Sequence, residues 1–151
     1  MRKDRKMLAV SFFAGFILIF GLLSFNTIES KDPNGWYHLK ENGKEIKGKA
    51  IVTVKDFKEI NLNSDSFGES PFYQITGTLK ENKIKTFAKA TEKAVGKQIG
   101  FLYNEEIISA PMINMPIETG NFSISNLSFK DKDRAIEIFE GLKREMDKNT
   151  N

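Results

Sequence analysis

The chain has 151 residues, of which 40% are hydrophobic and 28% are charged, a composition typical of one globular domain rather than a disordered protein. It contains no cysteine and one histidine, which excludes disulfide frameworks, thiolate metal sites and multi-histidine metal centres, and no cofactor is expected. The net charge of +3 arises within residues 1–6, so the rest of the chain is neutral and nucleic acid is not an expected partner.

Residues 7–25 form an apolar run without a charged residue, Asn, Gln or Pro. A helix of about 20 apolar residues crosses the roughly 30 Å hydrocarbon core of a bilayer. Basic residues precede the run and a neutral-to-acidic segment follows it. The positive-inside rule therefore keeps residues 1–6 as a cytoplasmic tip and places the bulk of the chain outside the cytoplasm. We expect a single-pass transmembrane anchor in the cell membrane.

A cleavable signal peptide is the alternative, and its removal would leave a secreted domain. The apolar region of a signal peptide usually runs for about 7–15 residues and precedes a small-x-small cleavage site. The run in this chain is longer. The candidate sites ending at Ser24 and Ser30 have Leu22 and Ile28 where a small residue is needed. We therefore favour the retained anchor.

Residues 26–47 are expected to form a stalk between the membrane and the domain. Within it, a short hairpin can pair residues 36–39 across Asn42-Gly43, a residue pair that suits a type I′ turn. Trp36 would lie either at the level of the lipid headgroups or packed on the domain. His38 is expected to be a surface or hairpin-packing residue without a catalytic role.

Residues 48–147 are expected to form the folded domain. Apolar and polar residues alternate over 73–79, which predicts a strand with one buried face. The preceding residues 63–71 have the composition of a polar loop. Other strands are predicted over residues 50–54, 98–103, 107–110 and 121–125, with an irregular strand or turn over 55–62.

Two amphipathic helices are predicted from apolar stripes at helical spacing. The first begins at a capping box, Thr78-x-x-Glu81, and ends at Gly96. The second begins at Ser128-x-x-Asp131 and leads to a short tail over residues 148–151. This order predicts an α+β fold in which one antiparallel sheet carries both helices on one face. The second helix has the apolar stripe Ala135, Ile138, Phe139, Leu142 and Met146.

A family resemblance is carried by residues 92–142, in which a helix, two strands, a loop and a further strand precede the last helix. The motif residues lie at the end of the first helix and in the segment that follows the second of those strands: Gly96, Lys97, Ser109, Ala110, Pro111 and Gly120. In these residues the chain resembles the head subdomain of the first extracytoplasmic domain of SecD and SecDF. The resemblance implies a ferredoxin-like, SecDF head-like fold and a non-enzymatic module that engages exported polypeptide.

The resemblance does not imply the transport activity of a whole SecDF protein. SecDF proteins assist export with a bundle of membrane helices that conducts protons, and a proton relay needs ionisable groups inside the membrane. The apolar run of this chain has none. We therefore expect a monomeric, membrane-anchored module that binds exported polypeptide or assists export. The alternative is a structural or interaction domain of the cell envelope that is unrelated to export.

A candidate binding segment lies at residues 110–117, which contain two Met, two Ile and two Pro. Proline keeps such a segment extended, and methionine adapts to varied apolar partners. Met112, Ile113 and Met115 are therefore candidates for contacts with an unfolded exported polypeptide or an envelope protein. The alternative is that alternate residues of the segment cap the core. The adjacent acids Glu105 and Glu106 are expected to be solvated at a turn, so neither a catalytic nor a metal site is expected.

Overall fold

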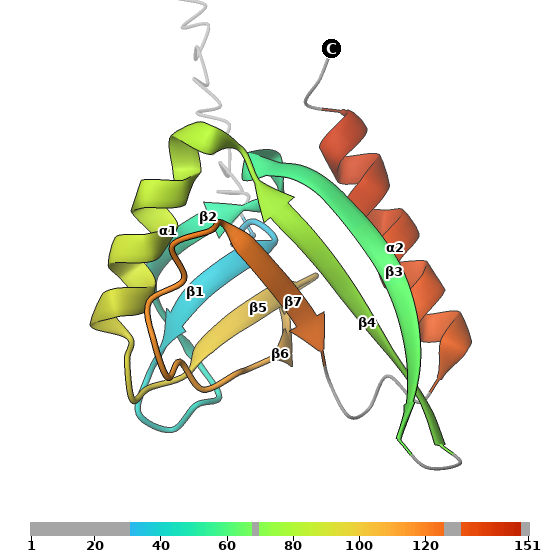
Figure 1. Ribbon diagram of the computed structural model, residues 1–151, viewed down its shortest axis with the longest axis horizontal. Coiled ribbons are helices and arrows are strands. Elements are labelled where there is room, and N and C mark those ends of the chain that lie inside the picture. The colour runs from blue at the N-terminus through green and yellow to red at the C-terminus, as the bar shows by residue number, and fades with distance from the viewer. Residues whose placement is uncertain (1–30, 68–69, 126–130, 149–151) are drawn as a thin grey trace, which may run out of the picture. The chain divides into compact units, whose positions relative to one another are not determined.

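The computed structural model describes residues 31–67, 70–125 and 131–148 (Figure 1). The predicted cytoplasmic tip, the predicted anchor and the last residues of the predicted tail lie outside the described residues. Within the described ranges, no helix has both the length and the apolar character needed to cross a bilayer.

In the described part of the chain, seven strands form two antiparallel sheets rather than one. The larger sheet has the strand order β2-β1-β5-β6 and the smaller one the order β3-β4-β7. The α+β class is confirmed, but the prediction of a single sheet is wrong. The difference arises because β3 and β4 form a long hairpin that pairs onward with β7, which leaves the other four strands to form their own sheet. The larger sheet contains β1 (Gly35–Leu39), β2 (Ile46–Thr53), β5 (Ile99–Tyr103) and β6 (Glu106–Ser109).

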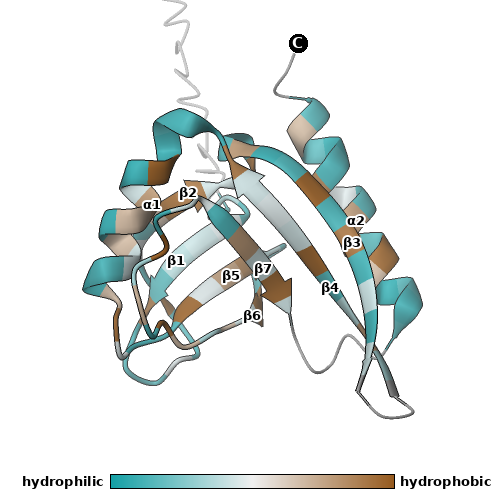
Figure 2. Cartoon of the chain, in the orientation of Figure 1, coloured by the Kyte–Doolittle hydropathy of each residue, from teal (hydrophilic) through white to brown (hydrophobic). Residues whose placement is uncertain are grey.

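The smaller sheet is formed by β3 (Phe57–Phe67), β4 (Ser70–Leu79) and β7 (Asn121–Ser125). Most of the predicted polar loop over residues 63–71 therefore belongs to strands. The side chains of residues 64–66 are exposed toward the end of this long hairpin, and just before them Asn63 Nδ2 donates to Thr76 Oγ1 at 2.7 Å. Hydrophilic and hydrophobic residues alternate along β3 and β4 in Figure 2. The hairpin thus has one face toward the core and one face toward solvent.

The hairpin predicted within the stalk is present, but it belongs to the folded domain. β1 lies inside the larger sheet, between β2 and β5. The Trp36 side chain is 1% exposed and its ring packs against Phe87, Phe101 and Phe122, with centroid distances of 5.2 to 6.5 Å. Of the two positions considered for Trp36, packing on the domain is therefore the one observed.

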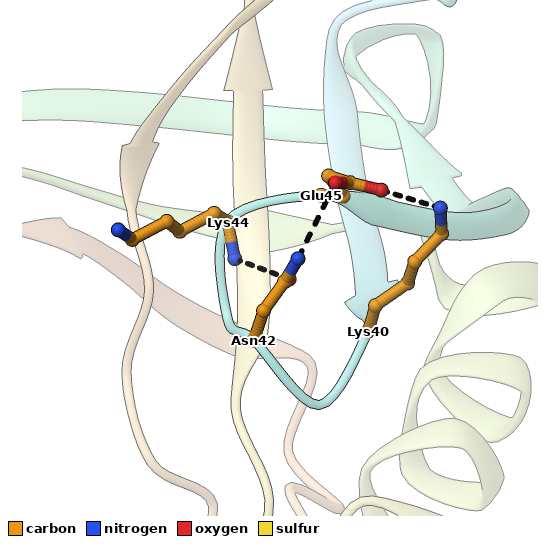
Figure 3. Close-up of polar contacts among 4 residues, drawn as sticks. All are labelled: Lys40, Asn42, Lys44 and Glu45. Carbon is orange, nitrogen blue, oxygen red and sulfur yellow. Dashed lines mark hydrogen bonds and ion pairs between the residues drawn. The ribbon is translucent and has the colours of Figure 1, made fainter.

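Side chains tie the β1–β2 turn together, as Figure 3 shows. Asn42 Nδ2 donates to Glu45 Oε1 at 3.3 Å, and Asn42 Oδ1 accepts from the Lys44 N–H at 3.0 Å. Lys40 forms an ion pair with Glu45. The hydrogen bond and the positive charge of Lys40 lower the pKa of the Glu45 carboxyl. Gly43 has a φ of +64°, but Asn42 does not have a positive φ, so the type I′ turn expected at this pair is not formed and a longer connection joins Leu39 to Ile46.

The two helices contact different sheets. Helix α1 (Glu81–Lys93) contacts β2 of the larger sheet, whereas α2 (Lys132–Asp147) contacts β3 and β4 of the smaller one. Figure 1 shows them on opposite sides of the strands. The expectation that both helices cover one face of one sheet is therefore wrong. The predicted apolar stripe of α2 is correct, since Ala135, Ile138 and Leu142 are buried.

The predicted capping box of α1 is not formed, because Thr78 lies within β4 and the N-cap residue is Lys80. A capping box instead begins the short 3-10 helix η1 (Val54–Asp56), where the Thr53 N–H donates to Asp56 Oδ2 at 2.9 Å. Helix α2 is capped by Asp131, whose side chain accepts from the Asp133 N–H at 2.9 Å.

Candidate binding groove

The candidate binding segment lies in the loop of residues 110–120, which connects β6 to β7. Backbone hydrogen bonds fix the middle of this loop to the residues that follow α1. The Gly96 N–H donates to the Ile113 carbonyl at 2.8 Å, and the Ile113 N–H donates to the Lys97 carbonyl at 2.9 Å. Gly96 has a φ of +78°, a conformation that glycine adopts without strain. Gly96 and Lys97 therefore hold the loop rather than line a reactive site.

The start of the loop is fixed to β5 in a similar way. The Ile99 N–H donates to the Pro111 carbonyl at 3.2 Å, and Gln98 Nε2 donates to the Ala110 carbonyl at 2.8 Å. Just before the loop, Ser109 is 4% exposed, and its Oγ donates to the Ser125 carbonyl at 2.7 Å. This last hydrogen bond joins the two sheets, since Ser109 lies in β6 and Ser125 in β7.

The second half of the loop is held by the buried side chain of Thr91 and by a close approach at Gly120. Thr91 Oγ1 accepts from the Ile117 N–H at 2.9 Å and donates to a carbonyl of its own helix. Gly120 has a φ of +74°, and a Cβ atom there would lie 2.7 Å from Cγ1 of Ile84. The Gly120 carbonyl accepts from the Leu79 N–H at 3.0 Å. All six family-motif residues thus shape this loop and its attachments.

A groove of about 680 Å³ lies beside this loop and β7, and polar residues of β3 and β4 also line it, among them Glu59, Asn61, Thr76 and Thr78. Its rim includes Met112 of the loop and the polar residues Asn121 and Ser123 of β7. The floor is apolar and is formed by Trp36, Phe87, Ile99, Ile113 and Phe122.

The three predicted binding residues occupy different positions. Met112 is 54% exposed at the rim of the groove, Ile113 is 4% exposed on its floor, and Met115 is 71% exposed on the adjoining surface, outside the groove lining. The segment therefore combines two exposed methionines with one residue that anchors it. The sequence left two alternatives open, a binding segment and a segment that caps the core. The exposed methionines fit the first alternative, and Ile113, which contributes to the core, fits the second.

Sequence analysis did not identify Trp36 as a residue of this site. Its indole Nε1 is buried and has no hydrogen-bond partner among the described residues. A buried indole N–H is usually paired. The sequence left packing on the domain open as one of two positions for Trp36, and the pairing of β1 with β5 brings it beneath the loop.

The residues considered for catalysis have structural partners instead. Glu105, at the β5–β6 turn, forms an ion pair with Lys31 at 3.1 Å, and Glu106 pairs with Arg134 of α2 at 2.7 Å. Burial lowers the pKa of His38, and the positive charges of nearby lysines lower it further. Among the described residues, no three His, Cys, Asp or Glu side chains are grouped so that they could hold a metal ion.

Comparisons with known proteins agree on one family. Residues 27–136 match the family described as SecDF, P1 head subdomain. Over 82 residues the chain is 32% identical to the protein translocase subunit SecD of Acidaminococcus fermentans, covering 54% of this chain and 19% of that protein. It is 25% identical over 101 residues to the SecD subunit of Aquifex aeolicus, covering 64% of this chain and 18% of that protein.

A solved structure of a SecDF membrane component "that enhances protein export" is similar in fold. The TM-score is 0.52 at 25% sequence identity, and the match covers 60% of this chain and 39% of the other. The matched segments amount to less than a fifth of the length of the two SecD subunits.

Proposed function

Because the chain belongs to the SecDF P1 head subdomain family, we propose that it is a non-enzymatic, extracytoplasmic module that binds exported polypeptide in its unfolded state. The observation that carries this proposal is the groove beside the loop of residues 110–120, which has an apolar floor and an exposed methionine at its rim. An unfolded chain exposes apolar side chains that a folded protein buries, and such a groove offers them a place to bind.

The attachment of the loop supports this role. Its backbone is fixed by hydrogen bonds to Gly96, Lys97 and Thr91, so little backbone entropy is lost when a ligand binds. The side chains of Met112 and Met115 remain free to adapt, because methionine is unbranched and polarisable. A fixed backbone with adaptable side chains suits binding that is weak and tolerant of sequence.

The proposed anchor over residues 7–25 would hold this domain at the outer face of the membrane. Confinement there raises its effective concentration toward chains that emerge from a translocon. Weak binding would then suffice for function. External protease added to intact cells should digest the domain, and a protected domain would contradict this topology.

The test is a double substitution, Met112→Ser with Met115→Ser, in the full chain. We expect it to weaken capture of an unfolded secretory polypeptide about tenfold, because each thioether loses apolar contact area. The melting temperature should hardly change, since both side chains are exposed. Ile136→Ser is the matched control, because Ile136 is an exposed apolar residue on α2 and does not line the groove.

Two outcomes would contradict the proposal. If the wild-type chain captures no unfolded polypeptide at high micromolar concentration, the export role fails and an interaction with a folded envelope component becomes the better hypothesis. If the methionine variant and the Ile136 control lose affinity equally, the binding surface lies elsewhere. Crosslinking from residue 112 in living cells identifies the partner in either case.

A further inference from the structure

Strand β7 forms one edge of the smaller sheet, and its only neighbour in the described sheet is β4. In an antiparallel pair, residues that exchange backbone hydrogen bonds alternate with residues that do not. The Leu79 N–H donates to the Gly120 carbonyl at 3.0 Å, and the register continues through β7 without a shift. Every second residue from Gly120 onward therefore bonds to β4. The residues between them direct their backbone N–H and C=O groups away from β4: Asn121, Ser123 and Ser125.

The two ends of this free edge are already occupied. The Asn121 N–H donates to Thr119 Oγ1 at 3.2 Å, and the Ser125 carbonyl accepts from Ser109 Oγ at 2.7 Å. Between them, the backbone N–H and C=O of Ser123 have no partner within the part of the chain that the structure describes. Exposed edges are usually protected by lysine, proline or a β-bulge. This stretch of β7 has none of the three, so its backbone is open to pairing.

The free edge of β7 borders the groove, since Asn121, Ser123 and Ser125 line it together with Met112 of the loop and with Thr76 and Thr78 of β4. Side chains of a strand alternate between its two faces, so a strand placed beside β7 would direct every second side chain toward the apolar floor. The floor also contains Trp36, whose buried N–H lacks an acceptor among the described residues.

From these observations we propose that the groove binds an extended segment of polypeptide as an added β-strand, paired through its backbone with Ser123 of β7. The inference rests on the proposed function and specifies its ligand, a segment in which apolar and polar residues alternate. Backbone pairing explains how one groove accepts many sequences. Main-chain hydrogen bonds are common to all polypeptides, while the apolar floor sets a preference for alternate apolar side chains.

The test uses the full 151-residue chain and a peptide of alternating valine and threonine, with two N-methylated versions. One version carries N-methyl groups on the valines and the other on the threonines. In a strand, successive residues point both their side chains and their N–H groups in opposite directions. An added strand therefore directs toward β7 either the N–H groups of its valines or those of its threonines, but not both. We expect one methylated peptide to bind about tenfold more weakly and the other to bind like the parent peptide. Fluorescence of Trp36, the single tryptophan, reports binding at the floor.

The outcomes separate this inference from the proposed function. If the parent peptide and an unfolded secretory polypeptide both fail to bind, the proposed function is wrong. If the parent peptide binds and the two methylated versions bind the protein with equal affinity, the ligand does not pair as a strand. The groove would then bind side chains alone, which overturns the inference and leaves the proposed function standing.

A second measurement uses the protein side of the same hydrogen bond. Ser123→Pro removes the N–H that faces the groove, and proline is tolerated on an edge strand where the N–H is not used by the sheet. We expect about tenfold weaker peptide binding with this variant. Ser123→Ala is the control, because it keeps the backbone N–H and loses only the hydroxyl that donates to Gln74 at 3.2 Å. Equal affinity of the two variants would overturn the inference, and if the proline variant does not fold, the methylated peptides still decide.

Discussion

The loop of residues 110–120 and the β1–β2 turn are both exposed connections, but they are held in different ways. The turn is tied within itself, by backbone hydrogen bonds of Lys40 and Gly43 and by side chains, since Asn42 and Lys40 both contact Glu45. The loop is tied through its backbone to Gly96, Lys97 and the buried Thr91, which leaves Met112 and Met115 unused by the fold. The turn thus uses the side chains of Lys40, Asn42 and Glu45 for its own shape, whereas the loop keeps two apolar side chains exposed.

The largest loss of stability in the loop of residues 110–120 is expected from Gly120→Ala. Alanine at a φ of +74° is strained, and its Cβ would lie 2.7 Å from Cγ1 of Ile84. Backbone strain of about 1 kcal/mol and overpacking of about 1–3 kcal/mol together predict a loss of about 2–4 kcal/mol in the free energy of unfolding. This loss is measured by unfolding the variant and the wild-type chain in denaturant.

Gly96→Ala is the matched control for that substitution. Gly96 has a similar φ of +78°, but nothing lies within 4 Å of the position that a Cβ would take. We therefore expect it to cost only the backbone strain, about 1 kcal/mol. Equal losses for the two variants would mean that the contact with Ile84 does not constrain the loop.

A smaller effect is expected from Thr91→Val, which keeps the side-chain shape and removes the hydroxyl. The Ile117 N–H then loses its acceptor, and a backbone donor left unpaired in a partly buried position costs about 1–3 kcal/mol. Amide hydrogen exchange at Ile117 should become faster, while exchange in the β1–β2 turn should not change. Thr91→Ser retains the hydroxyl and should restore slow exchange at Ile117, and a serine variant as fast as the valine variant would show that packing rather than the hydrogen bond holds the loop.

The smallest effect is expected from protonation of Glu45 at low pH, and it should act on the β1–β2 turn. The pKa of Glu45 lies below its ordinary value of 4.5 in the folded chain, because Lys40 donates a hydrogen bond to it and carries a positive charge. The pair therefore stabilises the turn above that ordinary pKa, and the stabilisation is lost as the pH falls through the folded-state pKa. Amide chemical shifts of Gly43 and Lys44 should then move, whereas that of Ile113, which has no carboxyl neighbour in the chain, should not. Equal movement in both regions would contradict the distinction drawn between them.

The elements predicted correctly from sequence are those with a burial pattern of their own. The alternation over residues 73–79 was sufficient to predict a strand, and the apolar stripe of α2 was sufficient to predict a helix, because each pattern reflects one buried face. The strand over 63–67 was missed because its side chains are mostly polar and its partner, β4, supplies the buried face. The division into two sheets was missed for a similar reason. The pairing of β1 with β5 joins residues more than 60 positions apart, and no local pattern encodes it.

The candidate site was predicted only in part. The composition of residues 110–117 predicted a binding segment; Met112 and Met115 are exposed in the structure, and binding by them stays a prediction. It did not distinguish Ile113 from its neighbours, because Ile113 is buried by the hydrogen bonds that its backbone makes to Gly96 and Lys97. Neither the free edge of β7 nor the position of Trp36 is visible in the sequence, since both depend on which strands pair.

The exposure of Met112 and Met115 has a chemical consequence outside the cytoplasm. Oxidants convert an accessible thioether to a sulfoxide, which is polar and bulkier at the sulfur. Because both side chains are more than half exposed, we expect oxidation to leave the domain folded while removing the apolar character of its loop. The same exposure that lets the methionines meet a ligand therefore makes the loop sensitive to oxidative damage, and methionine sulfoxide reductases would be needed to reverse it.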